Sequence, residues 1–334
     1  MLAIFNVTAP FFALVLCGYL AARARLLPDN AVPALNGFVL YFALPCMLFR
    51  FTANTPLAQL LNLHIFSTYL AAGLITLGFT AFALVYGHGE RVRDAALGAL
   101  AVAWSNWGYM GFALIPPLLG PQATATIIAA GLGDLTVILV IALSLATVGD
   151  AQGGGPKAAL VAALRGVSKN PLIWSVLVGV VFSAADAKLP VALDTFVRLL
   201  ATGAGPVALF AIGVSLYRAP AASPASATTA SAAAQAVASN PLLQGDVLFL
   251  TFAKLVLHPY LLLVVATFAH VPAEAKHVLV LVAALPAAGT VFLLAGRHGA
   301  NAERIASVIL LTTALAFFTF SLMLYLVGAT PKVL

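Results

Sequence analysis

Two membrane-length apolar segments of this chain are interrupted in their middle. Residues 98–120 are broken by Ser-Asn-Trp-Gly-Tyr-Met-Gly at 105–111, and residues 278–299 by Leu-Pro-Ala-Ala-Gly-Thr at 285–290. Proline removes a backbone donor, glycine favours non-helical angles, and lipid cannot replace the lost hydrogen bonds. Broken backbone at membrane depth must therefore be surrounded by protein or line a polar cavity. Two such breaks in corresponding places of two halves predict the substrate site of a secondary transporter.

The composition supports a membrane protein. Of the 334 residues, 63% are hydrophobic and 8% are charged, unlike the balance of soluble proteins. A chain of this length can hold about ten spans of roughly 20 residues with short loops. The formal net charge is +6, but the basic residues are scattered at span ends without an aromatic-laced patch, so no nucleic-acid partner is expected. We expect a multi-pass, all-α membrane protein.

The apolar stretches predict ten spans and their orientation. The expected spans are 3–22, 32–50, 62–86, 95–118, 122–146, 171–187, 191–217, 246–269, 276–297 and 303–327. No basic residue precedes the first stretch, whereas Arg23 and Arg25 follow it, which indicates an uncleaved segment with its N-terminus outside. This orientation places ten Lys and Arg residues in cytoplasmic loops and five at the outer side, which with Lys254 accounts for all 16. Ten spans then place both termini outside.

The two halves carry matching prolines. Pro10 and Pro45 in the first half, and Pro171 and Pro206 in the second, occupy equivalent places, and each pair is 35 residues apart. Five spans in each half force opposite orientations on the halves, which is the inverted-repeat plan of alternating-access transporters. We divide the chain into a first repeat at 1–148, a cytoplasmic linker at 149–170, and a second repeat at 171–334 with a flexible Ala/Ser/Pro loop at 219–240.

At these residues the sequence resembles the auxin efflux carrier family in its short bacterial form. The similarity covers nearly the whole chain, through Tyr-Phe-Ala-Leu-Pro at 41–45, the break at 105–111, Lys254-Leu255 followed by Pro259, and Ala-Leu-Pro at 284–286. It implies a fold like that of bile-acid sodium symporters, with two inverted five-helix repeats. In that fold spans 1, 2, 6 and 7 form a scaffold, and the others form a moving transport domain in which spans 4 and 9 cross.

The resemblance also implies a substrate class. Bacterial relatives are often called malonate or dicarboxylate permeases, and plant relatives export an indole carboxylate. We therefore expect elevator-type transport of small organic anions, such as malonate or auxin-like carboxylates, across a bacterial cytoplasmic (inner) membrane. The plant carriers are dimeric, so a homodimer is expected. The sequence departs from the family pattern at Trp107, where a small polar residue is usual, and at His258 before Pro259; each could reshape the cavity.

Asn106 is the first candidate for substrate contact. Its side-chain amide supplies two donors and an acceptor within the first break. The half-helix that begins near Gly108 directs its positive N-terminal end to the same place, which suits a carboxylate. The predicted substrate-binding set is Asn106, Gly108, Gly111, Pro286, Gly289 and Thr290. The alternative is a Gly/Pro kink that serves only helix packing.

Asp134 and Lys254 are the candidates for ion or proton coupling. A carboxylate near the bilayer centre costs about 2.5–3.5 kcal/mol, so Asp134 should be paired, protonated or hydrated, and it is a candidate proton carrier. A structural carboxylate is the alternative. Lys254 could pair with Asp134 or attract an anion, or it could snorkel to the interface. His258 lies four residues beyond Lys254 on the same helix face, where simple hydrogen bonding suffices as its role.

The remaining polar residues predict little chemistry. Cys17 and Cys46 lie inside apolar spans and are expected to be small buried hydrophobes. Asp194 and Arg198 stand four apart, the spacing of a local ion pair, and Arg50 is expected to anchor the interface. No Walker loop, catalytic triad, redox motif or metal-ligand spacing is present, so we expect no enzyme, cofactor or metal. A sodium-coupled symporter and a non-transporting sensor on the same fold remain alternatives.

Overall fold

The structure is a computed structural model that describes residues 2–28, 30–57, 62–148, 171–218 and 245–328. Within these residues the regular elements are helices and one isolated β-bridge. The predicted linker at 149–170 and the predicted loop at 219–240 lie outside the described residues.

The first half of the chain forms helices that match its five predicted spans. They are α1 (Leu2–Arg23), α2 (Ala31–Phe38), η1 (Val39–Ala43), α3 (Leu44–Ala53), α5 (Leu63–Phe82), η2 (Ala83–Gly87), α6 (Val92–Ala103), η3 (Trp107–Gly111), α7 (Phe112–Leu119), α8 (Ala123–Gly133), η4 (Asp134–Ile138) and α9 (Leu139–Val148). The elements marked η are single wide π-helical turns within or between α-helices.

The second half continues in the same way. Its helices are α11 (Pro171–Ala184), α12 (Val191–Arg218), α14 (Gly245–Phe252), η6 (Ala253–Leu257), α15 (His258–Phe268), α16 (Ala273–Ala283), α17 (Thr290–Arg297) and α18 (Ala302–Leu326). Predicted spans 4 and 9 are therefore interrupted, between α6 and η3 and between α16 and α17.

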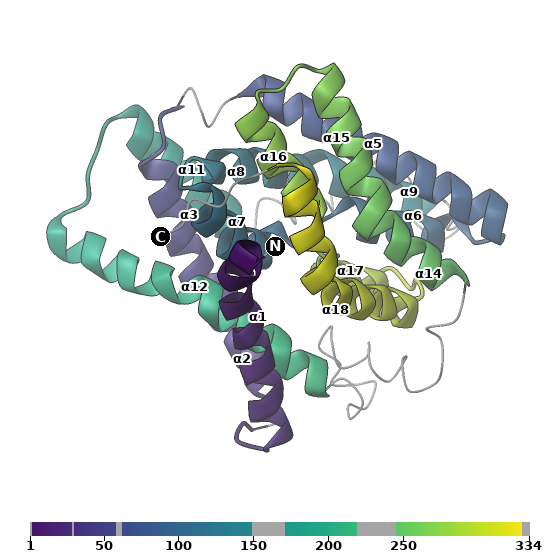
Figure 1. The fold of residues 1–334 in the computed structure, drawn as a ribbon, viewed down its shortest axis with the longest axis horizontal. Helices are drawn as coiled ribbons and strands as arrows, with labels where there is room; N and C mark the ends of the chain where they lie inside the picture. The colour runs from purple at the N-terminus through teal and green to yellow at the C-terminus, as the bar shows by residue number, and fades with distance from the viewer. Residues whose placement is uncertain (1, 29, 58–61, 149–170, 219–244, 329–334) are drawn as a thin grey trace.

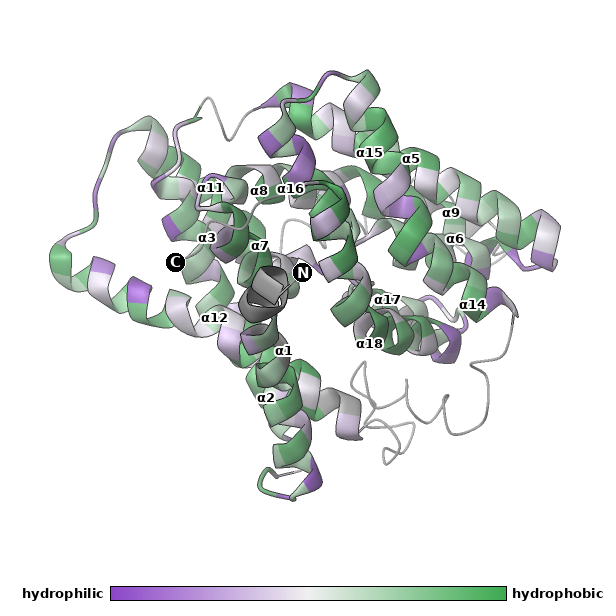
Figure 2. Ribbon diagram, in the orientation of Figure 1, coloured by the Kyte–Doolittle hydropathy of each residue, from purple (hydrophilic) through white to green (hydrophobic). Residues whose placement is uncertain are grey.

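Several helices are long and apolar enough to cross a membrane, judged by length and composition. In the described part of the chain six stretches qualify, namely Ala31–Ala53, Leu63–Gly87, Ala123–Ala146, Val191–Val214, Gly245–Phe268 and Ala302–Leu326. Shorter apolar helices occur at Ala13–Arg23, Trp107–Leu119 and Pro171–Ala184. Large apolar side chains face outward, for example Phe268 at 81% exposure, and Figure 2 shows hydrophobic residues along most helices. The chain is an all-helical, multi-pass membrane protein.

Two of the π-turns precede prolines. A proline within a helix lacks the N–H for the i→i−4 bond, and its ring clashes with that carbonyl. The wide turn η1 comes just before Pro45, and η6 comes just before Pro259. Such turns are common at functional sites. Lys254 lies in η6, and Asp134 begins η4 after Gly133.

The helices pack as two groups. In one, α1 packs along α12, and α3 packs against α11 and α12; in the other, α5, α6, α8, α9 and α14 to α18 pack together. Figure 1 shows α3, α11 and α12 on the left and α5, α6 and α14 on the right, with α7 between them. The helix α7 contacts α1 and α12 of the first group and α8 and α16 of the second.

The contact between α1 and α12 depends on two glycines. A Cβ atom on Gly213 would lie 1.8 Å from the carbonyl oxygen of Val15, and one on Gly18 would lie 2.0 Å from that of Phe210. Small residues allow helix backbones to approach closely in membranes, where packing drives association. This pair of helices is therefore held backbone to backbone.

Two sequence predictions are wrong here. Asp194 pairs with Arg50 on α3, not with Arg198, so within the described residues the ion pair joins two helices instead of one helix turn. Arg50 therefore has an ion-pair partner near the end of α3. Cys17 is exposed on α1 and Cys46 is half-buried, and both are free thiols. The burial of the cysteines could not be predicted, because the sequence of a helix that is apolar on every side does not reveal which face packs against protein.

Candidate functional site

The two broken segments cross, and their backbones pair. The chain leaves α6 in an extended conformation, and Ser105 forms an isolated antiparallel bridge with Ala287, between α16 and α17. The backbone N–H of Ala287 also donates to the hydroxyl of Thr312 on α18, at 3.2 Å. Protein groups thus satisfy the hydrogen bonds that the helix breaks leave open.

Two backbone hydrogen bonds flank this bridge. The N–H of Asn106 donates to the carbonyl oxygen of Pro286 at 2.9 Å, and the N–H of Ala288 donates to that of Trp104 at 3.1 Å. The predicted crossing of segments 98–120 and 278–299 is therefore present. Pro286 itself is buried, and its carbonyl is taken by Asn106, so its role is to shape the crossing.

Asn106 retains a free side chain at this place. It is half-buried and precedes η3, and its side-chain amide makes no hydrogen bond with the described residues. Its carbonyl oxygen accepts from the N–H groups of Met110 and Gly111 at 3.0 and 3.1 Å. An amide held by its backbone and unpaired at its tip can bind a ligand without breaking a bond first.

The other predicted substrate residues lie along the two half-helices. Gly108 and Gly111 are in η3, directly after Asn106. Gly289 caps the N-terminus of α17, and Thr290 is its exposed first residue. Each half-helix therefore begins at or near the crossing and points its positive end toward it.

Lys254 joins the crossing from η6. Its Nζ donates to the Oγ of Ser105 at 2.6 Å and lies 3.1 Å from the Nδ1 of His258. All three side chains are fully buried, so Lys254 does not snorkel to the interface. An ammonium group with two polar partners thus lies directly beside the break in segment 98–120.

Asp134 lies on the other side of the same cluster. Its Oδ2 accepts a hydrogen bond from the hydroxyl of Tyr69 at 3.1 Å, and both side chains are fully buried. Its Oδ1 has no hydrogen-bond partner among the described residues. The hydroxyl of Tyr69 also lies beside that of Ser105. Asp134 and Lys254 attract each other, although no direct ion pair joins them. One buried polar row therefore runs from His258 to Asp134.

Trp107 closes over this row. Its indole lies beside the carboxylate of Asp134, and its N–H has no hydrogen-bond partner among the described residues. A Cβ atom on Gly131 would lie 2.6 Å from the Trp107 ring, so the glycine makes the space that the ring fills. The departure from the family pattern at 107 is thus accommodated on α8.

Sequence reasoning missed Tyr69 as a member of this site. A tyrosine in an apolar span has no signal that separates it from an interface residue. From the sequence, Ser105 was interpreted only as part of a break. Its contact with Lys254 could not be predicted, because that contact depends on how α14 packs against α6.

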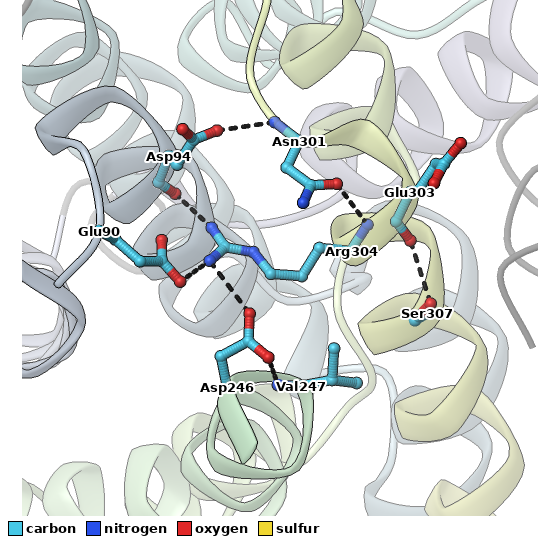
Figure 3. A network of polar contacts seen from close by, with 8 residues as sticks. All are labelled: Glu90, Asp94, Asp246, Val247, Asn301, Glu303, Arg304 and Ser307. Carbon is cyan, nitrogen blue, oxygen red and sulfur yellow. Dashed lines mark hydrogen bonds and ion pairs between the residues drawn. The ribbon is translucent and has the colours of Figure 1, made fainter. Parts of the chain in front are cut away.

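A second polar cluster surrounds Arg304, at the starts of α6, α14 and α18 (Figure 3). The guanidinium pairs with Glu90 and with Asp246, and it donates to the backbone carbonyl of Asp94 at 2.6 Å. The carboxylate of Asp94 accepts from the N–H of Asn301 at 2.7 Å. Arg304 is one of the ten basic residues that the sequence assigns to cytoplasmic loops, and nothing further was predicted for it. Its buried guanidinium in fact joins three helix ends.

The chain also matches a known protein family. The profile of the family described as "Membrane transport protein" matches residues 3–151 and 156–324. The chain belongs to the auxin efflux carrier family. This member of the family is a membrane transporter and not an enzyme.

Relatives span most of the chain. A protein of Rhizobium meliloti (strain 1021) named "Putative malonate transporter" is 30% identical over 345 residues, covering 99% of this chain and 98% of the relative. The "Uncharacterized transporter YfdV" of Escherichia coli (strain K12) is 25% identical over 293 residues, which is 86% of each. The "Lysosomal cholesterol signaling protein" of Mus musculus is 26% identical over 215 residues. These residues cover 61% of the present chain and 25% of the mouse protein.

Proposed function

We propose that this protein is a secondary transporter of small organic anions, mono- or dicarboxylates such as malonate. The observation that carries the proposal is the crossing of the two broken segments. There the side-chain amide of Asn106 is unpaired and lies near the starts of two half-helices, and Lys254 donates a hydrogen bond to Ser105 in the first break. Donor amides, helix N-termini and an ammonium group all favour a carboxylate. The name of the Rhizobium meliloti relative supports the same class of substrate.

The transport step is alternating access of the elevator type. The helices α1, α2, α3, α11 and α12 form the scaffold, and the second group, with the crossing, forms the part that moves. The close glycine contacts between α1 and α12 suit a rigid scaffold. Each group takes helices from both of the proposed inverted repeats, at 1–148 and 171–334. The protein acts as a homodimer in the bacterial cytoplasmic membrane, with both termini outside.

Coupling is to protons, through Asp134 and Lys254. The supporting geometry is the buried row of polar groups that joins the two residues through Tyr69 and Ser105. A carboxylate with one oxygen unpaired in this row can take up a proton without losing its bond to Tyr69. A sodium-coupled symporter is the second candidate, but a buried ammonium at the crossing repels a second cation.

The test is uptake and counterflow of labelled malonate in proteoliposomes under an imposed proton gradient, a sodium gradient or neither. We expect the proton gradient to drive accumulation. Asp134→Asn should abolish that accumulation and retain exchange. Accumulation driven by sodium alone contradicts proton coupling, and absence of any flux with malonate or other carboxylates supports a sensor instead.

A further inference from the structure

A cavity lies between the first group of helices and α7, the helix that follows the break in segment 98–120. It has a volume of about 580 Å³ and is enclosed by α1, α3, α7 and α12. This volume is typical of sites for small molecules, which measure about 300–1,000 Å³. At its floor α12 approaches α7 closely, because a Cβ atom on Gly205 would lie 3.3 Å from that of Ala113. The cavity is therefore bounded on one side by the second half of the broken segment.

The wall of this cavity is mostly apolar, and two arginines line it at one end. Met47, Phe51 and Leu209 contribute apolar surface, and Arg50 and Arg198 line the cavity where α3 ends and α12 begins. This end of the cavity lies toward the outside in the predicted orientation.

The two arginines differ in what balances their charge. The charge of Arg50 is balanced by Asp194. Arg198 is exposed and makes no ion pair with the described residues, although Asp194 lies one helix turn away. A net positive charge over an apolar chamber matches an organic anion with a carboxylate head and a small apolar body.

Aromatic rings connect this cavity to the crossing. The ring of Phe51 stacks on that of Phe112, with centroids 6.0 Å apart, and Phe112 meets Trp107 edge to face at 6.1 Å. Phe51 and Phe112 both line the cavity, whereas Trp107 lies over Asp134 at the crossing. An anion in the cavity is thus one layer of aromatic rings away from the polar row.

We propose that this cavity is a second binding site for the transported anion, in which Arg198 holds the carboxylate before it passes the Phe51–Phe112 pair to the crossing. The inference rests on the proposed function, because it takes the same class of ligand. It adds Arg198 as a specificity-determining residue that lies outside the crossing.

The kinetic test compares Arg198→Ala with Lys188→Ala in malonate uptake. Lys188 is a matched control, because it is an exposed basic residue that lines the neighbouring cavity beyond Arg50 and not this one. Arg198→Ala should raise the half-saturating malonate concentration about tenfold, the change that 1.4 kcal/mol produces, with little effect on the maximal rate. Lys188→Ala should leave both unchanged, and Arg198→Lys should restore part of the affinity. Equal effects of the two alanine variants indicate a general surface potential and overturn the proposal.

The second test needs no transport. The two native cysteines are replaced (Cys17→Ser, Cys46→Ser), and Thr202→Cys is introduced in the wall of the cavity. A membrane-impermeant thiol reagent should label this position, and saturating malonate or benzoate should slow the labelling. Adding Arg198→Ala should remove the protection. Labelling that neither carboxylate slows overturns the second site.

The two tests also separate the possible causes of failure. If malonate is transported but does not slow the labelling, the second site is contradicted and the proposed function stands. If a carboxylate slows the labelling but no flux is found, the proposed function is contradicted and the binding site stands. The labelling is repeated in liposomes of neutral and of anionic lipid. Protection that depends on anionic lipid and not on the carboxylate identifies a lipid headgroup as the occupant, which also overturns the proposal.

Discussion

The Nζ of Lys254 lies 2.6 Å from the Oγ of Ser105, which places a fully buried ammonium group on the crossing of two broken helices. Taking a charge into a membrane protein costs about 2.5–3.5 kcal/mol even on the lenient insertion scale. Ser105 and His258 provide partners, and Asp134 provides attraction from the far end of the row. A buried charge that costs this much free energy at the centre of a transporter indicates that Lys254 functions in substrate binding or coupling.

Replacing Lys254 by Met keeps the volume and removes the charge. We expect malonate flux to fall by about tenfold or more, because hydrogen bonds to charged groups contribute about 1.5–3 kcal/mol. The measurement is counterflow in proteoliposomes. Lys188→Met, an exposed basic residue on the scaffold side, serves as the control and should transport normally. Normal counterflow in Lys254→Met excludes a transport role for the ammonium group.

Tyr69→Phe removes one hydroxyl from the buried row. The variant loses the 3.1 Å hydrogen bond to Asp134, a net contribution of about 0.5–1.5 kcal/mol. We expect slower proton-driven accumulation with exchange retained. The control is Tyr86→Phe in the same predicted span, whose side chain is 76% exposed. If both variants accumulate malonate like the wild type, Tyr69 is not part of the proton path.

Gly131→Ala tests the fit of Trp107. The added Cβ would lie 2.6 Å from a ring that has no flexible end, and overpacking of this kind costs about 1–3 kcal/mol. The temperature of thermal unfolding in detergent should fall. Adding Trp107→Ala should recover part of the loss, because the ring is then gone. Gly78→Ala is the control, since nothing lies within 4 Å of its added Cβ. Additive effects of the two substitutions contradict the contact.

Arg304→Ala tests the cluster shown in Figure 3. It leaves Glu90 and Asp246 without their cation, and breaking a buried ion pair from one side costs about 3–5 kcal/mol. We expect marked thermal destabilisation in detergent, while Arg91→Ala, an exposed neighbour, should have little effect. Adding Glu90→Gln to Arg304→Ala should recover stability. Wild-type stability in Arg304→Ala shows that the cluster does not hold the three helix ends together.

The backbone of the site was predictable from sequence, because glycine and proline act locally. The residues around Asn106 and Pro286 mark the breaks, and at membrane depth a break needs a partner. That the two broken spans cross was implied by the resemblance to the auxin efflux carrier family. The β-bridge between Ser105 and Ala287 confirms this crossing.

The side-chain partners were not predictable in the same way. The pairing of Arg50 with Asp194 joins residues 144 positions apart, and it depends on how α3 packs against α12. Tyr69 faces Asp134 instead of lipid because of the rotation of α5, which an evenly apolar helix does not encode. For the same reason the exposure of Cys17 was predicted wrongly.

The most direct test of the central claim is malonate counterflow by Asn106→Ala in proteoliposomes, with Asn36→Ala as the control. Asn36 is a half-buried residue of α2, away from the crossing. The account predicts wild-type counterflow in the control. In Asn106→Ala the counterflow rate should fall by about tenfold or more, because the amide binds the charged carboxylate of the substrate. Both variants should unfold at the wild-type temperature. Wild-type counterflow in Asn106→Ala would contradict the assignment of the substrate site to the crossing.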